Sequence, residues 1–394
     1  MSAHPQLSID EFCETGSGGT PSRATKEYYG GNIPWVKSGE LREGMITDTE
    51  EKITERAIKE SSAKIVPSGA ILLAMYGATV GRMAFLGVDA ATNQAVCNIR
   101  PDLKRAYPRY VFHCLQSKIN HFLSRAAGGA QPNISQGIIK ETKIPLPPLD
   151  EQRRIAAILD KADELRCKRK HAVDLLDRLT QSIFKDMFDG SAQTLSISEL
   201  LSRGWLVLHK DGNHGSNYPR ADEFGEDGVP FLSAKSIDNE GFIDPEQIQY
   251  LSTSKAETLK IGWIEAGDIL LAHNASVGKV ALYEGQFDKA LIGTSLTCYR
   301  PNSKRLLSQY LMSALRSQFF QSQLTKSMGQ TTRNQVPITS QRDLKIPIPS
   351  IEQQRKYSDV VAAQMKRATV FRHGAISLEM LFSALQHRAF SGKL

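Results

Sequence analysis

The chain contains a long tandem repeat, and this feature constrains the fold more than any other. The segment Lys143-Ile-Pro-Leu-Pro-Pro-Leu-Asp-Glu-Gln-Arg-Arg154 returns as Lys345-Ile-Pro-Ile-Pro-Ser-Ile-Glu-Gln-Gln-Arg-Lys356. The similarity extends outward in both directions, and residues 69–84 resemble residues 267–281. A direct repeat over most of a chain predicts two copies of one structural unit. We call them copy one and copy two.

Length and composition are compatible with two folded copies. The chain has 394 residues, and 41% hydrophobic content is enough for each copy to bury a core. No apolar run approaches the roughly 18 residues of a membrane span, so we expect a soluble, cytoplasmic protein. The five cysteines lack Cys-x-x-Cys spacing, and we expect neither disulfides, nor a metal site, nor a cofactor. The net charge of +7 is compatible with nucleic acid but does not require it.

Each copy is predicted to be a mixed α/β domain followed by a long helix. Short apolar strands are expected at 70–75, 82–86 and 95–99, and a helix at 108–124. Copy two repeats this pattern with strands at 268–272, 279–283 and 296–299 and a helix at 308–327. The predicted boundaries are residues 1–147 for the first domain, 148–190 for the first long helix, 191–349 for the second domain and 350–394 for the second long helix.

The two long helices are predicted to pair with each other. Each has about 39 residues, or roughly 58 Å at 1.5 Å per residue. Ser350-Ile-Glu-Gln353 is typical of a capping box, and Gly190 and Gly392 mark the two C-terminal ends. Apolar stripes run along both helices, and an isolated stripe of this kind is poorly stable in water. The stripe residues are Ile155, Ile158, Ala162, Leu165, Ala172, Leu176, Leu179 and Ile183 in the first helix and Tyr357, Val361, Met365, Ala368, Ala375, Leu378, Phe382, Leu385 and Ala389 in the second.

The order of domains and helices along the chain predicts the architecture. The first domain precedes the first helix and the second domain follows it, so the second helix must run back antiparallel to reach its partner. We therefore expect two similar globular domains separated by an antiparallel two-helix coiled coil, in a dumbbell with a pseudo-two-fold axis.

Double-stranded DNA is a suitable target for two similar but unequal domains. It presents similar grooves at every helical turn, and two-fold proteins read paired half-sites across it. Copy one has the loop Gly129-Ala-Gln-Pro-Asn-Ile-Ser135, whereas copy two has Gly329-Gln-Thr-Thr-Arg-Asn-Gln335. Arginine suits guanine in the major groove, and asparagine or glutamine suits adenine, so unequal loops imply unequal half-sites.

Candidate DNA-binding residues lie at matching places in the two copies, and each has a purely structural interpretation beside it. Arg82 and Lys279 follow equivalent turns between strands, where phosphate contacts and solvated charges are both expected. Tyr76, His273 and Asn274 precede those turns, where loop packing is the alternative. For the polar residues in the glycine-led loops, helix capping and turn formation are the alternatives to DNA contact. The remaining candidates are Lys37, Ser38, Lys235 and Ser236 after the Pro-aromatic strands, and Gln131, Asn133, Arg333 and Asn334 in the glycine-led loops.

Two patterns suggest enzyme chemistry, and neither is convincing. Pro101-Asp102 with Glu141-Thr142-Lys143 imitates a magnesium-dependent nuclease pattern, but copy two has Pro301-Asn302 and loses a ligand. The turns at 77–82 and 275–279 lack the spacing of a phosphate loop and favour tight turns between strands. No Asn/Asp-Pro-Pro-Tyr/Phe methyltransferase signature is present. The sequence therefore predicts no catalytic residues, with a self-sufficient nuclease and a coiled-coil scaffold that binds protein as the alternatives.

In these features the chain resembles the specificity subunits of type I restriction-modification systems over nearly its full length. The resemblance rests on the duplication, the paired helices, the Pro-x-Pro junctions and the opening Gly16-Ser-Gly-Gly-Thr-Pro-Ser22. Copy two departs from that opening with Asp211-Gly-Asn-His-Gly-Ser-Asn-Tyr-Pro219.

The resemblance implies a function without catalysis. Such subunits read an asymmetric bipartite site in double-stranded DNA through two target recognition domains. They recruit modification subunits, which bind S-adenosylmethionine and methylate adenine, and restriction subunits, which translocate and cut. The helical pair would then act as a ruler for the spacing of the half-sites. Glu151, Gln152, Gln353 and Gln354 at the junctions are expected either to meet the modification subunit or to serve the start of each helix.

Overall fold

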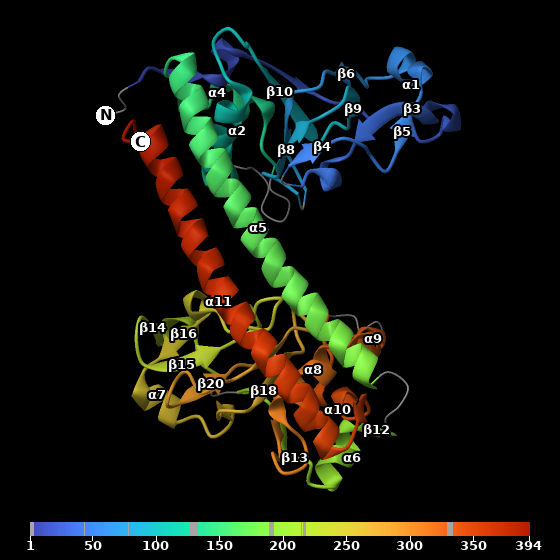
Figure 1. The fold of residues 1–394 in the computed structure, drawn as a ribbon, viewed down its shortest axis with the longest axis vertical. Helices are drawn as coiled ribbons and strands as arrows, with labels where there is room; N and C mark the ends of the chain where they lie inside the picture. The colour runs from blue at the N-terminus through green and yellow to red at the C-terminus, as the bar shows by residue number, and fades with distance from the viewer. Residues whose placement is uncertain are drawn as a thin grey trace. The chain divides into compact units, whose positions relative to one another are not determined.

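The computed structural model describes residues 4–42, 44–77, 79–125, 133–188, 193–213, 215, 218–328 and 334–394. These residues form two compact units (Figure 1). Unit 1 comprises residues 1–168 and 375–394, and unit 2 comprises residues 169–374. Each of the two long helices contributes one part to unit 1 and the other part to unit 2.

The described residues of unit 1 form two main sheets and four short helices. One sheet has the order β2 (Cys13–Ser17), β10 (Val96–Pro101), β7 (Ile71–Ala74), β8 (Met83–Leu86) and β4 (Met45–Ile46). The other has the order β5 (Lys52–Ile53), β3 (Tyr29–Val36), β9 (Ala90–Thr92) and β6 (Ile65–Val66). A small sheet pairs β1 (Gln6–Ser8) with β11 (Lys143–Pro145). The helices are α1 (Glu55–Glu60), α2 (Pro108–Ser117), α3 (Ile119–Ser124) and α4 (Gln136–Glu141).

Unit 2 repeats this plan. One sheet has the order β13 (Leu206–Asp211), β21 (Leu296–Pro301), β18 (Ile269–Ala272) and β19 (Val280–Leu282). The other has the order β14 (Phe224–Gly225), β16 (Gln249–Leu251), β15 (Val229–Leu232), β20 (Ala290–Ile292) and β17 (Trp263–Ile264). β12 (Gln193–Ser196) pairs with β22 (Lys345–Ile348). The helices are α6 (Ile197–Ser202), α7 (Thr253–Glu257), α8 (Ser308–Arg316), α9 (Gln318–Met328) and α10 (Ile338–Gln341).

The central strand pair has the same register in the two copies. Cys97 of β10 lies opposite Leu73 of β7, and Thr297 of β21 lies opposite Leu271 of β18. In both copies a buried tyrosine, on α2 in copy one and on α8 in copy two, bonds to the junction before the long helix. The Tyr110 hydroxyl donates to the Pro145 carbonyl at 2.8 Å, and the Tyr310 hydroxyl donates to the Pro347 carbonyl at 2.6 Å.

The predicted helices at 108–124 and 308–327 are each two helices. The break is Lys118, directly after Ser117, in copy one and Ser317 in copy two. The Ser117 hydroxyl donates to the Cys114 carbonyl at 2.7 Å, and the Ser317 hydroxyl donates to the Ala314 carbonyl at 2.6 Å. A serine that bonds to its own helix in this way competes with the backbone ladder, so the helix ends there. The apolar periodicity continues through the break, which is why the sequence predicts one helix.

The long helices α5 (Leu149–Phe188) and α11 (Ile351–Phe390) pack antiparallel within each unit (Figure 1). In unit 1, Arg154 donates to the Leu394 carbonyl at 2.9 Å, and Arg166 pairs with Glu379 at 2.9 Å. From the first contact to the second, the residue number increases in α5 and decreases toward α11, as it does in an antiparallel pair.

The same direction holds in unit 2. The Arg169 guanidinium lies 4.7 Å from the centre of the Phe371 ring, and the rings of Phe184 and Tyr357 are 5.5 Å apart. The predicted antiparallel pairing of the long helices is therefore confirmed within each unit.

The predicted stripe on α5 is wrong at two positions. Leu165 and Leu179 are 44% and 45% exposed, whereas Phe184 and Phe188 are buried. Phe184 packs against Tyr310 of α8 with ring centres 5.6 Å apart, so this end of α5 turns its apolar face toward the globular domain as well as toward α11. The α11 stripe is buried at Tyr357, Val361, Phe382 and Ala389, as predicted.

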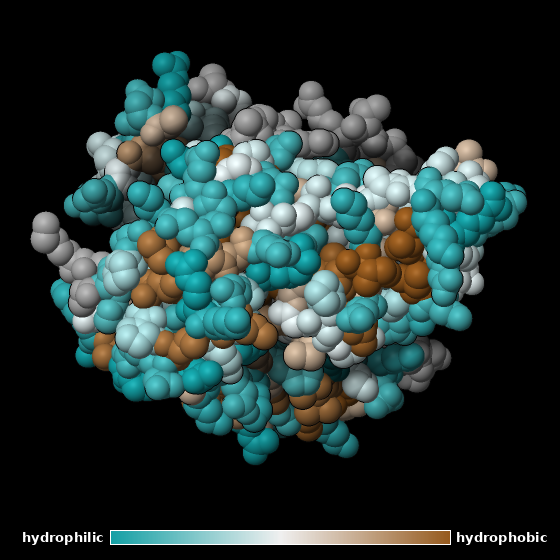
Figure 2. All heavy atoms as spheres, turned by 90° about the horizontal axis from the view of Figure 1, so that it is seen from above, coloured by the Kyte–Doolittle hydropathy of each residue, from teal (hydrophilic) through white to brown (hydrophobic). Residues whose placement is uncertain are grey.

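Polar side chains cover most of the face seen in Figure 2, with hydrophobic residues scattered between them. Across the part of the chain that the structure describes, no helix is both long enough and apolar enough to cross a membrane.

Candidate nucleic-acid interface

In copy one, two loops that the sequence predicts to bind DNA lie side by side. The turn after β7 and the loop before α4 are joined by an isolated bridge between Tyr76 and Asn133. Beside it, the Ile134 amide donates to the Met75 carbonyl at 2.7 Å. Tyr76 is half-buried and Asn133 is exposed, so the structure brings together one aromatic and one amide side chain from the predicted set.

Copy two builds the same junction of loops from other residues. An isolated bridge joins Asn274 and Gln335. The Val336 amide donates to the His273 carbonyl at 2.9 Å, and the Ala275 amide donates to the Asn334 carbonyl at 3.2 Å. Asn334 is exposed and Asn274 is half-buried. Gln131 of copy one and Arg333 of copy two lie outside the described residues.

The segments that precede β8 and β19 connect neighbouring strands of one sheet, as the sequence predicts. β7 and β8 pair antiparallel, and so do β18 and β19. Gly77 and Gly81 of the first turn have φ of 82° and 83°, and Gly278 of the second has φ of 99°. These values lie in the left-handed region that glycine adopts without steric cost.

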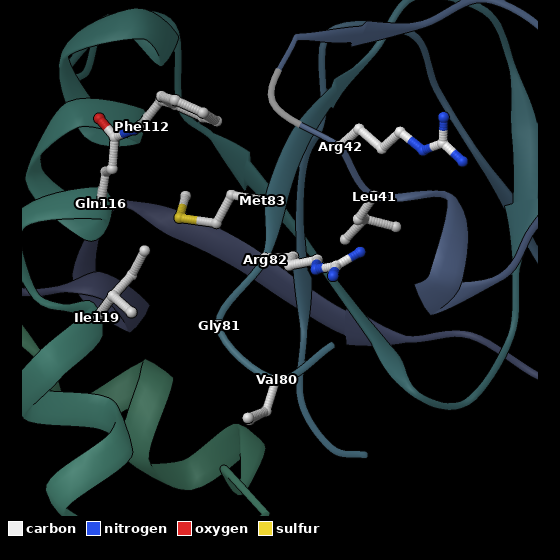
Figure 3. Close-up of a pocket in the computed structure, with 9 residues that line it drawn as sticks. All are labelled: Leu41, Arg42, Val80, Gly81, Arg82, Met83, Phe112, Gln116 and Ile119. Atoms are coloured by element: carbon white, nitrogen blue, oxygen red, sulfur yellow. The ribbon is translucent and has the colours of Figure 1, made fainter. Parts of the chain in front are cut away.

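Arg82 is an exposed cation at the end of the first turn, and the structure places a second one near it. Arg42 and Arg82 both line a groove of about 440 Å³, together with Leu41, Val80, Gly81, Met83, Phe112, Gln116 and Ile119 (Figure 3). In that view both guanidinium groups point away from Met83, Gln116 and Ile119. Neither group has an ion-pair partner within the described residues, and both are exposed. Arg42 does not stand out in the sequence, because the residue at the equivalent place after the matching 3-10 helix of copy two (Ala234–Ser236) is Asp238, which has the opposite charge.

Lys279, the counterpart of Arg82, already uses its ammonium group in a hydrogen bond within copy two. It is half-buried, and its ammonium donates to the Ile237 carbonyl at 2.8 Å. A larger groove of about 1130 Å³ lies at the same place in unit 2, and Lys279 and Arg316 are among the residues that line it. A hollow beside the candidate cation is thus a repeated feature of the fold.

The residues after the Pro-aromatic strands are less available than the sequence suggests. The Lys37 ammonium pairs with Glu50 at 3.0 Å and with Glu51 at 3.1 Å, and these hydrogen bonds raise the pKa of Lys37. Its charge is therefore compensated within copy one. Ser38 is half-buried and begins a short 3-10 helix (Ser38–Glu40), and Lys235 is exposed.

Two of the predicted contacts are buried and need correction. Ser236 is 0% exposed, and its hydroxyl donates to the Gln247 carbonyl at 3.0 Å. His273 is 4% exposed, and its ring bonds to the Thr297 hydroxyl at 2.8 Å. Both side chains are used inside copy two, so in this arrangement neither reaches a ligand. The sequence around a polar loop residue does not indicate whether its side chain points into the domain or toward solvent.

The junction glutamines also act inside the protein. Gln152 is 0% exposed, and its side chain accepts from the Tyr107 amide at 2.7 Å and donates to the Arg105 and Pro147 carbonyls at 2.9 and 2.8 Å. Gln354 is equally buried, and it forms the matching three bonds. This burial corrects the expectation that these two side chains meet another subunit.

Glu151 and Gln353 remain accessible at the starts of the long helices. Glu151 is 32% exposed and pairs with Arg154 at 2.7 Å. Gln353 is exposed and closes the predicted capping box, because its side chain accepts from the Ser350 amide at 3.0 Å and its amide donates to the Ser350 hydroxyl at 3.3 Å.

The nuclease-like pattern is a repeated turn. The Asp102 carboxylate accepts from the Lys104 amide at 3.0 Å, and the Asn302 side chain accepts from the Lys304 amide at 3.2 Å. An asparagine does the same work in copy two, so the position requires a turn-forming acceptor rather than a charge. Within the described ranges, no group of three or more histidine, cysteine or acidic side chains is arranged to hold a metal.

Acidification is expected to destabilise unit 2 through His209. Burial lowers the pKa of His209 to about 4, whereas an unfolded histidine titrates near about 6.5. The folded pKa is the lower one, so this contribution is complete above pH 6.5 and is lost as the pH falls toward 4. At pH 5 the loss is about 2 kcal/mol. Denaturant unfolding at pH 7 and pH 5 measures it, and His209→Gln should shrink the difference by that amount. Equal pH dependence in both proteins would contradict the assignment.

The fold and the loops define a class: duplicated α/β domains with polar loops at matching places, each followed by a long helix. The family model for the type I restriction modification DNA specificity domain matches residues 6–174 and 212–366. Because these matches cover well over half of the chain, the chain belongs to this family.

Individual relatives agree with the family match. The chain is 25% identical over 400 residues to the type I restriction enzyme MjaVIII specificity subunit of Methanocaldococcus jannaschii, covering 98% of this chain and 92% of that protein. It is 30% identical over 247 residues to the MjaIX specificity subunit of the same organism, where the match covers 58% of this chain and only 57% of the relative.

The fold agrees as well. The crystal structure of the type I restriction-modification system S subunit from M. genitalium superimposes with a TM-score of 0.56 at 16% identity, over 99% of this chain and 96% of that one. At this identity the likeness shows the shared fold.

Proposed function

We propose that the chain reads an asymmetric bipartite site in double-stranded DNA and itself catalyses nothing. Residues 1–147 and 191–349 serve as the two target recognition domains, and 148–190 and 350–394 as the helices that connect them. The family match and the names of the relatives, which are specificity subunits of type I restriction enzymes, support this function.

The observation on which the proposal rests is the repeated junction of two loops. Each copy joins the turn after its central strand to the loop before its last short helix, through Tyr76 and Asn133 in copy one and Asn274 and Gln335 in copy two. The backbone framework is the same and the side chains differ. That combination suits two half-sites of similar shape and different sequence.

The partners of such a subunit follow from the same class. Methyltransferase and restriction subunits supply the chemistry, and the complex acts in the cytoplasm, where its DNA lies. Glu151 and Gln353, the accessible junction residues, and the exposed candidates Lys235, Asn133 and Asn334 are the positions we assign to partner and DNA contacts. A scaffold whose domains bind only protein would show no sequence-selective, salt-sensitive retention of DNA.

Arg82→Ala is expected to weaken DNA binding by the chain in complex with its methyltransferase subunits. Each lost phosphate contact reduces the slope of log affinity against log salt by about 1, and the loss is similar for all DNA sequences. Titrations between low and moderate salt measure the slope. Arg56→Ala is the control, because Arg56 pairs with Glu60 at 2.9 Å on α1 and should leave the slope unchanged. An unaltered slope in Arg82→Ala would remove this residue from the interface.

The helices α5 and α11 are proposed to set the distance between the half-sites. Inserting one heptad after Lys168 and one after Gly374 keeps the antiparallel register and adds about 10 Å. We expect the preferred spacer to lengthen by about three base pairs at about 3.4 Å each. Selection from a DNA library with randomised spacers measures this. Insertion into one helix alone is the control and should disrupt pairing. An unchanged spacer in the double insertion would refute the ruler.

A further inference from the structure

A buried hydrogen-bond network in copy two centres on Gln341, which is 0% exposed. Its side-chain oxygen accepts from the Tyr299 hydroxyl at 2.7 Å and from the His209 ring at 3.3 Å. Its side-chain nitrogen donates to the Thr297 hydroxyl at 3.0 Å and to the Val336 carbonyl at 2.9 Å. All four hydrogen-bonding positions of the amide are used, so its orientation is fixed.

The network ends at the two loops of the candidate interface. The Thr297 hydroxyl, which accepts from Gln341, also shares a hydrogen bond of 2.8 Å with Nδ1 of the His273 ring. The His273 carbonyl in turn accepts from the Val336 amide. Two residues further along the same turn, the Ala275 amide donates to the Asn334 carbonyl. One side chain in the core thereby holds both the turn after β18 and the loop before α10.

The turn that it holds contains a strained residue. Ala275 has φ of 63°, and it is the sole non-glycine residue with positive φ in the described ranges. The equivalent residue of copy one is Gly77, which has φ of 82° without a steric penalty. A side-chain-bearing residue persists in this region only when its surroundings over-determine the backbone, and such residues cluster at functional sites.

Copy one fills the same space with apolar side chains. Strand register and the matching backbone bonds align Met75 with His273, Cys97 with Thr297, Ile99 with Tyr299 and Ile139 with Gln341. Met75, Cys97, Ile99 and Ile139 all belong to the hydrophobic core of copy one. The fold therefore does not require the network, since an equivalent domain is built without it.

We propose that His273 and Gln341 are positioning residues that fix the recognition turn of copy two and so determine base selectivity at the half-site that copy two reads. This inference rests on the proposed function. His273 and Gln341 touch no base. They hold the backbone of Asn274, Ala275 and Asn334 in one arrangement, and discrimination between bases depends on that arrangement because good base contacts tolerate little displacement.

The test compares sites selected from a randomised DNA library by the full chain with its methyltransferase subunits. The variants are His273→Met and Gln341→Ile, which install the residues of copy one, and Met75→Leu is the control in copy one. A photo-crosslinker at Lys235, which is exposed in copy two, identifies the half-site on which copy two lies. We expect discrimination between bases to fall about tenfold in that half-site and to stay unchanged in the other.

A third variant separates positioning from stability. Ala275→Gly removes the steric strain, so folding should be unimpaired, but it also frees the turn, and we expect the same half-site to lose selectivity. If Gln341→Ile does not fold, His273→Met and Ala275→Gly still decide the matter. Unchanged selectivity in these variants, or an equal loss in both half-sites, overturns the proposal. A wild-type chain that selects no bipartite site would instead overturn the proposed function.

Discussion

Arg300→Met is expected to lower the free energy of unfolding of unit 2 by about 3–5 kcal/mol, because it leaves a buried carboxylate without its counter-charge. Asp268 is 0% exposed, and the Arg300 guanidinium donates two hydrogen bonds to it, both at 2.7 Å. The same hydrogen bonds raise the pKa of Arg300, so its guanidinium keeps its positive charge. Denaturant unfolding of the purified chain measures the loss.

The repeat supplies the matched control. Arg100 occupies the equivalent position in copy one, where it pairs with Glu14 at 3.0 Å, and the two side chains are 40% and 76% exposed. Exposed pairs contribute about 0–1 kcal/mol, so Arg100→Met should cost little. Copy one has the buried Ala70 where copy two has Asp268. The double variant Asp268→Ala with Arg300→Met should therefore recover much of the stability. Equal losses from Arg300→Met and Arg100→Met would contradict this account.

Gln152→Ala is expected to destabilise unit 1 by about 3 kcal/mol, because it leaves one backbone amide and two backbone carbonyls around the buried side chain without hydrogen-bond partners. Gln354→Ala should act in the same way on unit 2, because the three bonds are repeated there. Glu151→Ala, one residue away, should stay within about 0.5 kcal/mol because its partner Arg154 is exposed.

Thermal or denaturant unfolding separates these variants. Large losses for Gln152 and Gln354 identify the junction glutamines as internal ties between the domain and its long helix. If instead Gln152→Ala folds normally and fails only to bind the methyltransferase subunits, the glutamine is an interface residue after all.

Local patterns account for what could be predicted from the sequence. Strands β7, β8 and β10 are short apolar runs between turn residues, and the capping box at Ser350 is a four-residue signal. Each requires only neighbours in sequence. The antiparallel pairing within each unit follows from chain connectivity and from the need to bury two apolar stripes.

Distant contacts account for what could not be predicted. His209 and Gln341 meet across more than a hundred residues, and nothing near either one indicates a buried polar network. The direction of a loop side chain is equally hidden: Ser236 and Lys235 are neighbours, yet one is fully buried and the other exposed. Leu165 and Leu179 fit the helical period of the apolar stripe, yet both side chains are exposed to solvent.

Unit 1 is assembled from two distant pieces of the chain, and this has a consequence for biosynthesis. Unit 2 is one continuous segment, whereas unit 1 needs residues 375–394 to cover Ile155, Ala156 and Leu159 of α5. On the ribosome the domain that emerges first is thus completed last, and its uncovered apolar helix is open to chaperones until both domains have been synthesised. Loss of residues 375–394 would therefore damage unit 1, although the rest of that unit is residues 1–168.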